Sequence, residues 1–479
     1  MSSRLQKVAV GSLIAFLVVA LNLTYWSTIE RDALRARADN PRRFEDERAI
    51  VRGSILDRNG VVLAYSEPVA RLPSGRIARR RVYPQASAFS VTGYYSLIYG
   101  SSGAEFAFDR ALRGAARADW WSAVLGEALN RPPQGDDVRL TVDAALQTAA
   151  AQAFGAYRGA LVLLEVPSGA IRALYSTPLY NPNTLDADWG QLRNDPRAPL
   201  VNRALQGSYQ MGGALQLVVY SAMLANPAAQ PQDLTGAAEP LSVNGLSLPC
   251  AVDPPAPIES LQSALAYGCP SLFANFAVQY PAEVQEKISA FGLLSALRLD
   301  GYPTAPEPRG IMLDASIDPD DRLREGAGQG NLTVTPLHMA LVASGIANHG
   351  NLVSPYIAEA LRPPESDNWE PLPRTPLERA ATTREAAGRI RAALRQAALS
   401  GSAQAAMSPA LPPEVTLYAH AGLAFSGDGH NGWLIGFVDL PDGRALAIAV
   451  VVEAAEDVHV AARIGGQLLA AAAQHALQE

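Results

Sequence analysis

An uncharged apolar segment near the N-terminus constrains this chain more than any other stretch of its sequence. Residues 8–26 read VAVGSLIAFLVVALNLTYW, follow Lys7 directly and end on Trp26. About 20 apolar residues suffice to cross a bilayer as a helix, and aromatic side chains favour its interface. The segment therefore predicts an uncleaved transmembrane anchor over residues 8–26, with residues 1–7 as a cytoplasmic tail.

A cleaved signal peptide is the alternative, because Val18 and Ala20 are residues of the type found before a cleavage site. In both cases we expect the long remainder to be exported, since long domains are translocated largely regardless of the charges beside the segment. The expected location is the cell membrane, with a single pass and with the bulk of the chain extracytoplasmic.

The composition excludes several classes of protein. A chain of 479 residues with 48% hydrophobic and 18% charged residues can bury a large core and is expected to form two or more domains. The net charge of −7 is mild, and without a basic stripe we expect no nucleic-acid partner. The two lysines are Lys7 and Lys287, so few residues could serve as a lysine base. Lys287 is expected to be a solvated partner of Glu283, four residues earlier.

The exported part divides into two predicted regions. Residues 27–137 are expected to form a charged stalk and a small N-terminal domain, in which Asn59–Gly60 separates two β-branched runs and predicts a hairpin. The stretch RPPQGDD, residues 131–137, is expected to be a linker. Residues 138–479 are expected to form the second domain.

The second domain is expected to combine helices and strands. The pattern predicts a helix over 140–154, with Asp143 near its start, and two strands around the turn Pro167–Gly169. It also predicts an alanine-rich helix at the C-terminus, preceded by strands over 416–425, 430–440 and 444–455. Helices packed on an antiparallel sheet make this domain α+β.

The two cysteines, Cys250 and Cys269, exclude a multi-cysteine zinc site. In an exported domain they could form one disulfide, which would stabilise the fold by roughly 3 kcal/mol. Two separate buried thiols are the alternative. The sequence leaves both open.

The stretch FSGDGHNGW carries Ser426, Asp428 and His430, and His420 lies one strand earlier. A serine–acid–histidine triad can be imagined here. However, residues 427–429 are typical of a tight turn, and two histidines with one aspartate lack a clear fourth metal ligand. We therefore expect a turn, with no metal and no cofactor.

Eight motifs occur in order between the anchor and the C-terminus. They are RGSILDRNGVVLA, RVYP, VTGYYSLIYGSSGAE, LTVDAALQ, GALVLLEVPSGAIRALYSTPLYNPN, NRALQGSYQMGG, GQGNLTVTPLHMALVASGIANHGNLVSPY and HNGWLIGFV. Together they resemble the class B penicillin-binding proteins of the short actinobacterial type. The resemblance implies a transpeptidase-like domain of the serine β-lactamase kind, preceded by a small pedestal or dimerisation-type domain.

Active members of that family, peptidoglycan D,D-transpeptidases, crosslink peptidoglycan with three motifs. A serine is activated by a lysine three residues later, an SxN motif lies across the cleft, and a KTG motif lies on a strand. In this sequence all three are degenerate. The serine and lysine positions hold Gly213 and Gln216, the SxN position holds Gly268, Cys269 and Pro270, and the KTG position holds His420, Ala421 and Gly422.

The resemblance with its lost motifs predicts a non-catalytic pseudoenzyme that acts as a scaffold or regulator of cell-wall synthesis. Its expected partners are the membrane and a membrane glycosyltransferase or an active penicillin-binding protein. One alternative is an active transferase or hydrolase that uses Cys269 with His420. Another is a sensor that holds a peptidoglycan stem peptide noncovalently in the vacated cleft.

Overall fold

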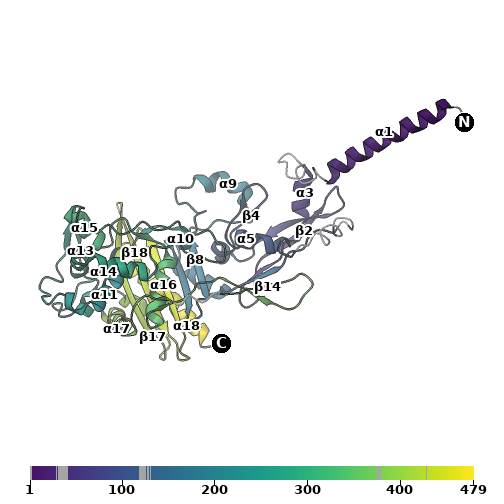
Figure 1. Cartoon of the computed structure of the whole chain (residues 1–479). Coiled ribbons are helices and arrows are strands. Elements are labelled where there is room, and N and C mark those ends of the chain that lie inside the picture. The colour runs from purple at the N-terminus through teal and green to yellow at the C-terminus, as the bar shows by residue number, and fades with distance from the viewer. Residues whose placement is uncertain are drawn as a thin grey trace.

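The computed structural model describes residues 3–28, 30, 41–117, 126, 129, 131–374, 379–427 and 429–478. Helix α1 (Ser3–Thr28) stands clear of the folded body (Figure 1). Its part Lys7–Trp26 is long and apolar enough to cross a membrane, as the sequence predicted. Residues 31–40 of the predicted stalk lie outside the described part, and helix α3 (Pro41–Ala49) follows them.

The N-terminal module is built on a six-stranded sheet with the order β15-β14-β6-β1-β2-β3. The predicted hairpin is confirmed, because β1 and β2 pair antiparallel on either side of Asn59–Gly60. The carboxylate of Asp57 accepts the N–H groups of Asn59 and Val61, each at 2.8 Å, which fixes the turn. The strands are β1 (Ile55–Leu56), β2 (Val62–Arg71), β3 (Ile77–Val82), β6 (Asp137–Leu140), β14 (Ala358–Arg362) and β15 (Glu370–Pro371).

The prediction of a linker over residues 131–137 is wrong. The N–H of Val51 donates to the carbonyl of Pro133 at 3.0 Å, and the N–H of Asp136 donates to that of Ala111 at 2.9 Å. Asp137 already belongs to β6, which pairs with β1 on one side and with β14 on the other. The polar, proline-rich composition suggested a free connection, but its backbone groups find partners in the sheet.

The larger body contains a five-stranded sheet with the order β17-β18-β19-β7-β8, in which every pair is antiparallel. The strands are β7 (Arg158–Val166), β8 (Ile171–Thr177), β17 (Thr416–Ser426), β18 (Gly429–Asp439) and β19 (Ala445–Glu453). They match the strands that the sequence predicted. The α+β fold class is therefore confirmed.

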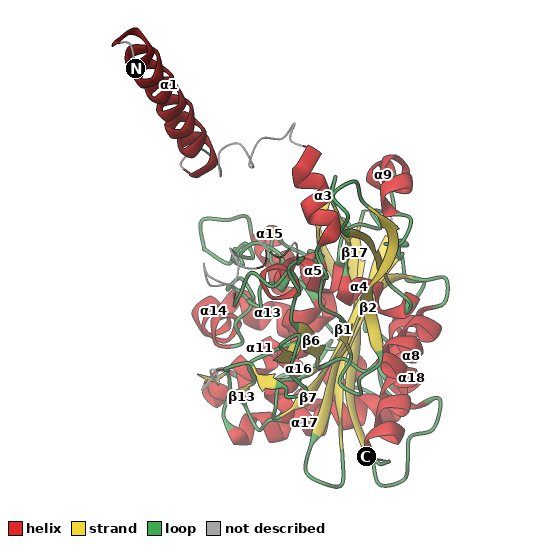
Figure 2. Ribbon diagram, turned by 90° about the vertical axis from the view of Figure 1, so that its right-hand side faces the viewer, coloured by secondary structure: helices red, strands yellow, loops and turns green. Residues whose placement is uncertain are grey.

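Helices cover both faces of this sheet (Figure 2). Along β19, Ala447, Ala449 and Val451 point into the core shared with α11 (Leu215–Ala225) and α16 (Pro336–Ala347). The alternate residues of β19 point to the other face, where α8 (Ala144–Phe154) and α18 (Val458–Ala476) pack. The predicted helix after Asp143 is confirmed, since the Asp143 carboxylate caps α8.

The remaining elements are short and surround these two sheets. In the N-terminal module they are α4 (Phe89–Thr92), α5 (Gly103–Ala107), α6 (Asp109–Leu112), β4 (Tyr95–Ser96) and β5 (Gly100–Ser101). In the larger body the helices are α9 (Leu185–Asn194), α10 (Arg203–Gln206), α12 (Leu261–Tyr267), α13 (Ser271–Gln279), α14 (Pro281–Ala290), α15 (Pro319–Gly326) and α17 (Arg384–Ser400). Its short strands are β9 (Tyr209–Gln210), β10 (Leu241–Val243), β11 (Leu246–Leu248), β12 (Thr333–Val334), β13 (Asn351–Leu352) and β16 (Arg379–Ala380).

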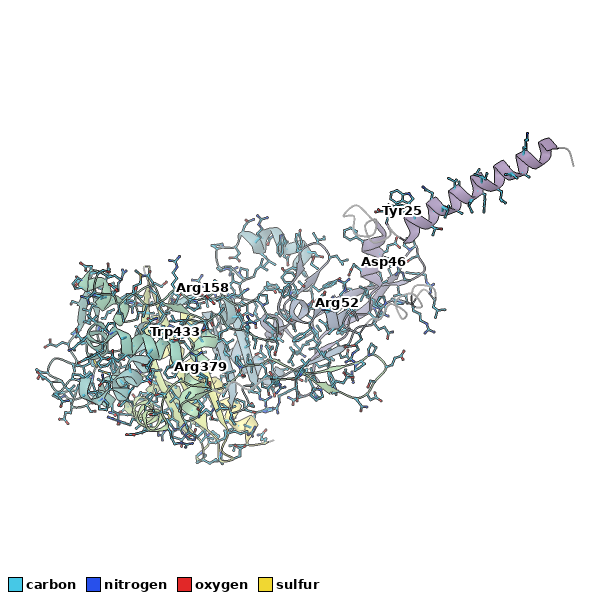
Figure 3. All side chains as sticks on the ribbon, in the orientation of Figure 1. Tyr25, Asp46, Arg52, Arg158, Arg379 and Trp433 are labelled. Atoms are coloured by element: carbon cyan, nitrogen blue, oxygen red, sulfur yellow. A yellow bond between two sulfur atoms is a disulfide. The ribbon has the colours of Figure 1, made fainter. Side chains whose placement is uncertain are left out.

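A buried carboxylate holds the N-terminal module together. Glu105 is fully buried and pairs with Arg52 at 2.9 Å and with Arg81 at 2.5 Å; Figure 3 labels Arg52. Arg52 also reaches Asp109 at 2.7 Å. Burial alone would raise the pKa of Glu105, but the two guanidinium groups outweigh it and hold the pKa below its usual value.

We expect Glu105→Gln to lower the free energy of unfolding by about 3 kcal/mol, because it removes the carboxylate partner of the buried Arg81 and leaves the buried Arg52 with Asp109 alone. Glu67→Gln is the matched control, since Glu67 is partly exposed and pairs only with the exposed Arg80. Urea unfolding followed by tryptophan fluorescence measures both. The carboxylate of Glu105 stabilises the fold above its unfolded-state pKa, and this contribution is lost as the pH falls through the lower folded-state pKa. The difference between wild type and variant should therefore shrink on acidification, and a constant difference would contradict this account.

Candidate functional site

The residue in the serine position lies in direct contact with a strand. Gly213 belongs to the short turn Gly212–Ala214 that leads into α11, and Gly422 lies on β17. A Cβ atom on Gly213 would lie 3.1 Å from the Cα of Gly422, and one on Gly422 would lie 2.9 Å from the Cα of Gly213. The two backbones therefore approach closely at the position that the sequence analysis assigned to the serine. We call Gly213, Gln216, Gly268–Pro270 and His420–Gly422 the motif site.

Neighbouring residues fix the turn that carries Gly213. The N–H of Gly212 donates to the carbonyl of Gly328 at 2.8 Å. The fully buried indole of Trp433, labelled in Figure 3, donates to the carbonyl of Gln210 at 3.0 Å. The side-chain amide of Gln210 in turn donates to the carbonyl of Gln329 at 3.0 Å. These bonds tie the turn to β18 and to the segment around Gly328.

The residue in the lysine position carries no ionisable group. Gln216 is buried in the first turn of α11, and its Nε2 donates to the carbonyl of Gly268 at 3.3 Å. Its buried Oε1 has no hydrogen-bond partner. An amide cannot take up a proton from a hydroxyl at neutral pH, so Gln216 cannot replace a lysine base.

The SxN position offers no side-chain donor. Gly268 ends α12 in the left-handed conformation, Cys269 is joined to Cys250 by a disulfide, and Pro270 precedes α13. The N–H of Ala251 donates to the carbonyl of Gly268 at 3.2 Å. The segment next to the disulfide therefore packs directly over this position. Of the two states that the sequence left open for the cysteines, the structure has the bridge.

His420, which the sequence analysis places at the first residue of the KTG motif, binds the backbone of Gly213. Its Nε2 donates to the carbonyl of Gly213 at 3.1 Å, and its Nδ1 lies 3.4 Å from the hydroxyl of Ser402. Complete burial lowers the pKa of His420 to about 4, although the bond to Gly213 opposes the shift. The imidazole is therefore neutral at neutral pH, and both ring nitrogens are occupied.

Side chains also cover the free edge of β17. The N–H of Ala421 donates to Ser402 Oγ at 3.2 Å, and the N–H of Phe425 donates to Gln329 Oε1 at 2.9 Å. An open strand edge could pair with the backbone of a peptide. At these positions the edge is already paired within the chain. Sequence reasoning missed Ser402 and Gln329, because nothing in the local pattern connects either residue to β17.

The other candidates of the sequence analysis lie apart from the motif site or carry no reactive arrangement. Ser426 is exposed at the end of β17, His430 places its ring against Phe425 at 4.5 Å, and Asp428 lies outside the described residues. In the part of the chain that is described, no three histidine, cysteine, aspartate or glutamate side chains gather to hold a metal ion.

The expectation for Lys287 is wrong. Its Nζ lies 3.4 Å from Glu286, not against Glu283, and only 14% of its side chain is exposed. Glu283 instead accepts a bond from Asn226 at 3.5 Å. A helical spacing of four residues predicts a contact only when both side chains turn towards each other, and here packing decides otherwise.

Two pockets lie on the described part of the chain, and no residue of the motif site lines either. The smaller has a volume of about 50 Å³ and lies between Phe89, Tyr180 and Tyr302. The larger has a volume of about 890 Å³ and lies beside the turn between β7 and β8, near Tyr356 and Arg374. Neither of these two pockets therefore opens at the motif site.

Comparison with known proteins identifies the family. The profile of the penicillin-binding protein transpeptidase domain matches residues 159–470, and that of the penicillin-binding protein A dimerisation domain matches residues 52–138. The chain belongs to the class B penicillin-binding proteins. This penicillin-binding protein is 33% identical over 387 residues, 76% of both chains, to the peptidoglycan D,D-transpeptidase PbpA of Mycolicibacterium smegmatis. It is 31% identical over 390 residues, 77% of both chains, to PbpA of Mycobacterium tuberculosis.

Solved structures agree with this assignment. The imipenem acyl-enzyme complex of penicillin-binding protein A from M. tuberculosis superposes with a TM-score of 0.76 at 30% identity and covers 89% of this chain and 99% of that one. A D,D-transpeptidase domain from Eggerthella lenta superposes with a TM-score of 0.75 over 90% of this chain and 100% of that one. At 24% identity the latter shows the fold alone. The family and the apolar helix α1 together indicate a membrane-anchored protein.

We expect Gly422→Ala to lower the free energy of unfolding of this penicillin-binding protein by about 1–3 kcal/mol, because the new methyl group meets the backbone of Gly213. Gly388→Ala is the matched control. Gly388 lies on the exposed face of α17 with open space around it, so the same substitution should be neutral or slightly stabilising. Thermal unfolding measures both, and equal behaviour of the two variants would show that the contact at Gly422 is looser than described.

We expect thiol titration to find no free thiol in the folded chain and two after reduction in denaturant. The bridge closes a loop between residues 19 apart in sequence, and its removal by Cys250→Ala with Cys269→Ala should cost about 3 kcal/mol. One or two reactive thiols in the folded, unreduced protein would contradict the bridge and return Cys269 to the candidate nucleophiles.

Proposed function

We propose that this penicillin-binding protein does not catalyse acyl transfer and instead acts as a scaffold or regulator in peptidoglycan synthesis. The contact between Gly213 and Gly422 carries the proposal, because it occupies the place where a nucleophile would attack. The link to peptidoglycan comes from the curated relatives, which are named peptidoglycan D,D-transpeptidases.

The chemistry of acyl transfer supports this proposal. The reaction needs a nucleophile, a base within hydrogen-bond reach and room for the tetrahedral intermediate beside backbone donors. Here the motif positions hold a glycine, the amide of Gln216 and the imidazole of His420. That imidazole is neutral, and both of its ring nitrogens have hydrogen-bond partners. Each of these residues lacks the reactive group that the family motif has at the same position. Together they fill the space with internal hydrogen bonds.

The two alternative functions receive less support. A thiolate mechanism would need a free Cys269, and its sulfur is bonded to Cys250. A sensor that holds a stem peptide in the vacated cleft would need an opening there, and neither pocket reaches the motif site. We therefore favour a role carried by surfaces outside the motif site.

The proposal places residues 1–7 in the cytoplasm, the transmembrane segment over residues 8–26 and the rest of the chain outside the membrane. The N-terminal domain, residues 27–137, and the second domain, residues 138–479, then lie beside the enzymes of wall synthesis. The proposed partner is a membrane glycosyltransferase or an active penicillin-binding protein. Helix α1 and the N-terminal module are the proposed contact, since neither depends on a catalytic serine.

We expect no covalent labelling when the full chain in detergent is incubated with a fluorescent penicillin and run on a denaturing gel. A relative with an intact serine–lysine pair serves as the positive control. We also expect no label on the Gly213→Ser and Gln216→Lys double variant, because His420 and Gly422 still fill the site. A heat-stable band on the wild-type chain would overturn the proposal. A band on the double variant alone would show that the reactive groups are lost while the space remains.

A further inference from the structure

The larger pocket is a groove that the proposed function does not use. It lies between the turn that joins β7 to β8 and the segments around residues 298–300 and 348–356, and its volume is about 890 Å³. We call it the basic groove and define it by Pro167, Ser168, Arg298, Asp300, Tyr356 and Arg374, which line it. Figure 3 labels Arg379, next to the lining residue Ala380, on the larger body and away from Tyr25 of α1.

The guanidinium group of Arg374 is positioned by an aromatic ring. Its Cζ lies 3.3 Å from the centre of the Tyr356 ring. Tyr356 is itself fixed by the sheet, because its N–H donates to the carbonyl of Gly169 at 3.1 Å and its carbonyl accepts the N–H of Ile171 at 2.9 Å. Stacking uses the flat face of a guanidinium and leaves the N–H groups at its edge available to an acceptor.

The second arginine of the groove is carried by a segment that is tied to the same wall. Arg298 precedes Asp300 by two residues, and the carboxylate of Asp300 accepts the N–H groups of Ile357 and Ala358 at 2.7 and 3.0 Å. Asp300 adopts a φ of 43°, so the carboxylate holds the chain in a left-handed turn at this point. The backbone of Arg298 is therefore anchored beside the segment that carries Tyr356.

The charges of the basic groove are not balanced within the chain. Among the described residues, no carboxylate forms an ion pair with Arg298 or with Arg374. Asp300, the one acidic residue that lines the groove, is engaged by two backbone N–H groups. Elsewhere in this acidic protein, less exposed arginines such as Arg52, Arg172 and Arg203 do have carboxylate partners, whereas Arg298 and Arg374 are exposed. Two guanidinium groups without partners in one groove favour an anionic ligand.

We propose that the basic groove binds a short peptide segment that carries carboxylates. The planar fork of arginine matches a carboxylate with two parallel hydrogen bonds. The volume is far larger than a single small anion requires and falls within the range of sites for larger ligands. Three prolines that line the groove, Pro167, Pro355 and Pro373, supply rigid apolar walls of the kind that accommodate the stem of a peptide.

The test measures binding of a fluorescein-labelled tetraglutamate peptide to the full chain in detergent by fluorescence anisotropy, with tetraglutamine as the neutral probe. We expect the acidic peptide to bind and the neutral peptide not to bind. The double variant Arg298→Ala and Arg374→Ala should weaken binding at least tenfold. Arg463→Ala is the matched control, because Arg463 is an exposed arginine on α18, outside the groove, and its loss removes a similar charge.

A further variant tests whether binding depends on the geometry of the Arg374 guanidinium or only on its positive charge. Arg374→Lys keeps the charge but loses the fork and the flat stacking surface, so we expect a clear loss of affinity. Equal binding by wild type and Arg374→Lys, or an equal loss in Arg463→Ala, would overturn the proposal in favour of unspecific attraction. Binding of inorganic phosphate as tight as that of the peptide would overturn it in favour of a small-anion site. None of these results depends on whether the motif site is catalytic. A failure of the groove proposal in this assay can therefore be told apart from a failure of the proposed function in the penicillin assay.

Discussion

The bond from His420 to the carbonyl of Gly213 joins the two elements between which a transpeptidase cleft would lie. It ties β17 to the turn before α11, and the two glycines beside it let the backbones come into contact. Further bonds surround this contact. Ser402 and Gln329 accept N–H groups from the edge of β17, whose other edge pairs with β18, and the side-chain amide of Gln216 donates to the carbonyl of Gly268.

Under the proposed non-catalytic function, the motif site is an ordinary protein interior. A lysine or a serine in these positions would be a polar group that needs solvent or a substrate, and burying it unpaired would be costly. Glycine, a neutral imidazole and a bridged cysteine need neither. On this proposal a loss of reactive groups and a loss of space would support each other, because small or internally bonded residues allow the two elements to come into contact.

The sequence predicted the architecture well because the relevant signals are local or repeat along a strand. Alternation of residues identified the central strands, Asn59–Gly60 identified the first hairpin, and Asp143 identified the start of α8. The motif positions rest on the sequence resemblance alone, since they follow recognisable stretches. The sequence could not predict that Gly213 touches Gly422, because the contact joins segments distant in the chain. The roles of Ser402 and Gln329 depend only on where the fold places them, so no local pattern indicates them. Residues 131–137 were predicted to be a linker because composition does not reveal pairing with β1 and β14.

The sheet of the N-terminal module contains strands from both ends of the exported chain. β6 lies between β1, which leaves the membrane early, and β14, which begins only at Ala358. During synthesis one edge of β6 therefore stays unpaired until some 220 further residues have been made, as the interval from Leu140 to Ala358 requires. The module nearest the membrane is thus completed only once β14 and β15 are made, and a chain truncated before β14 would have an open sheet edge that invites association with other unfinished chains.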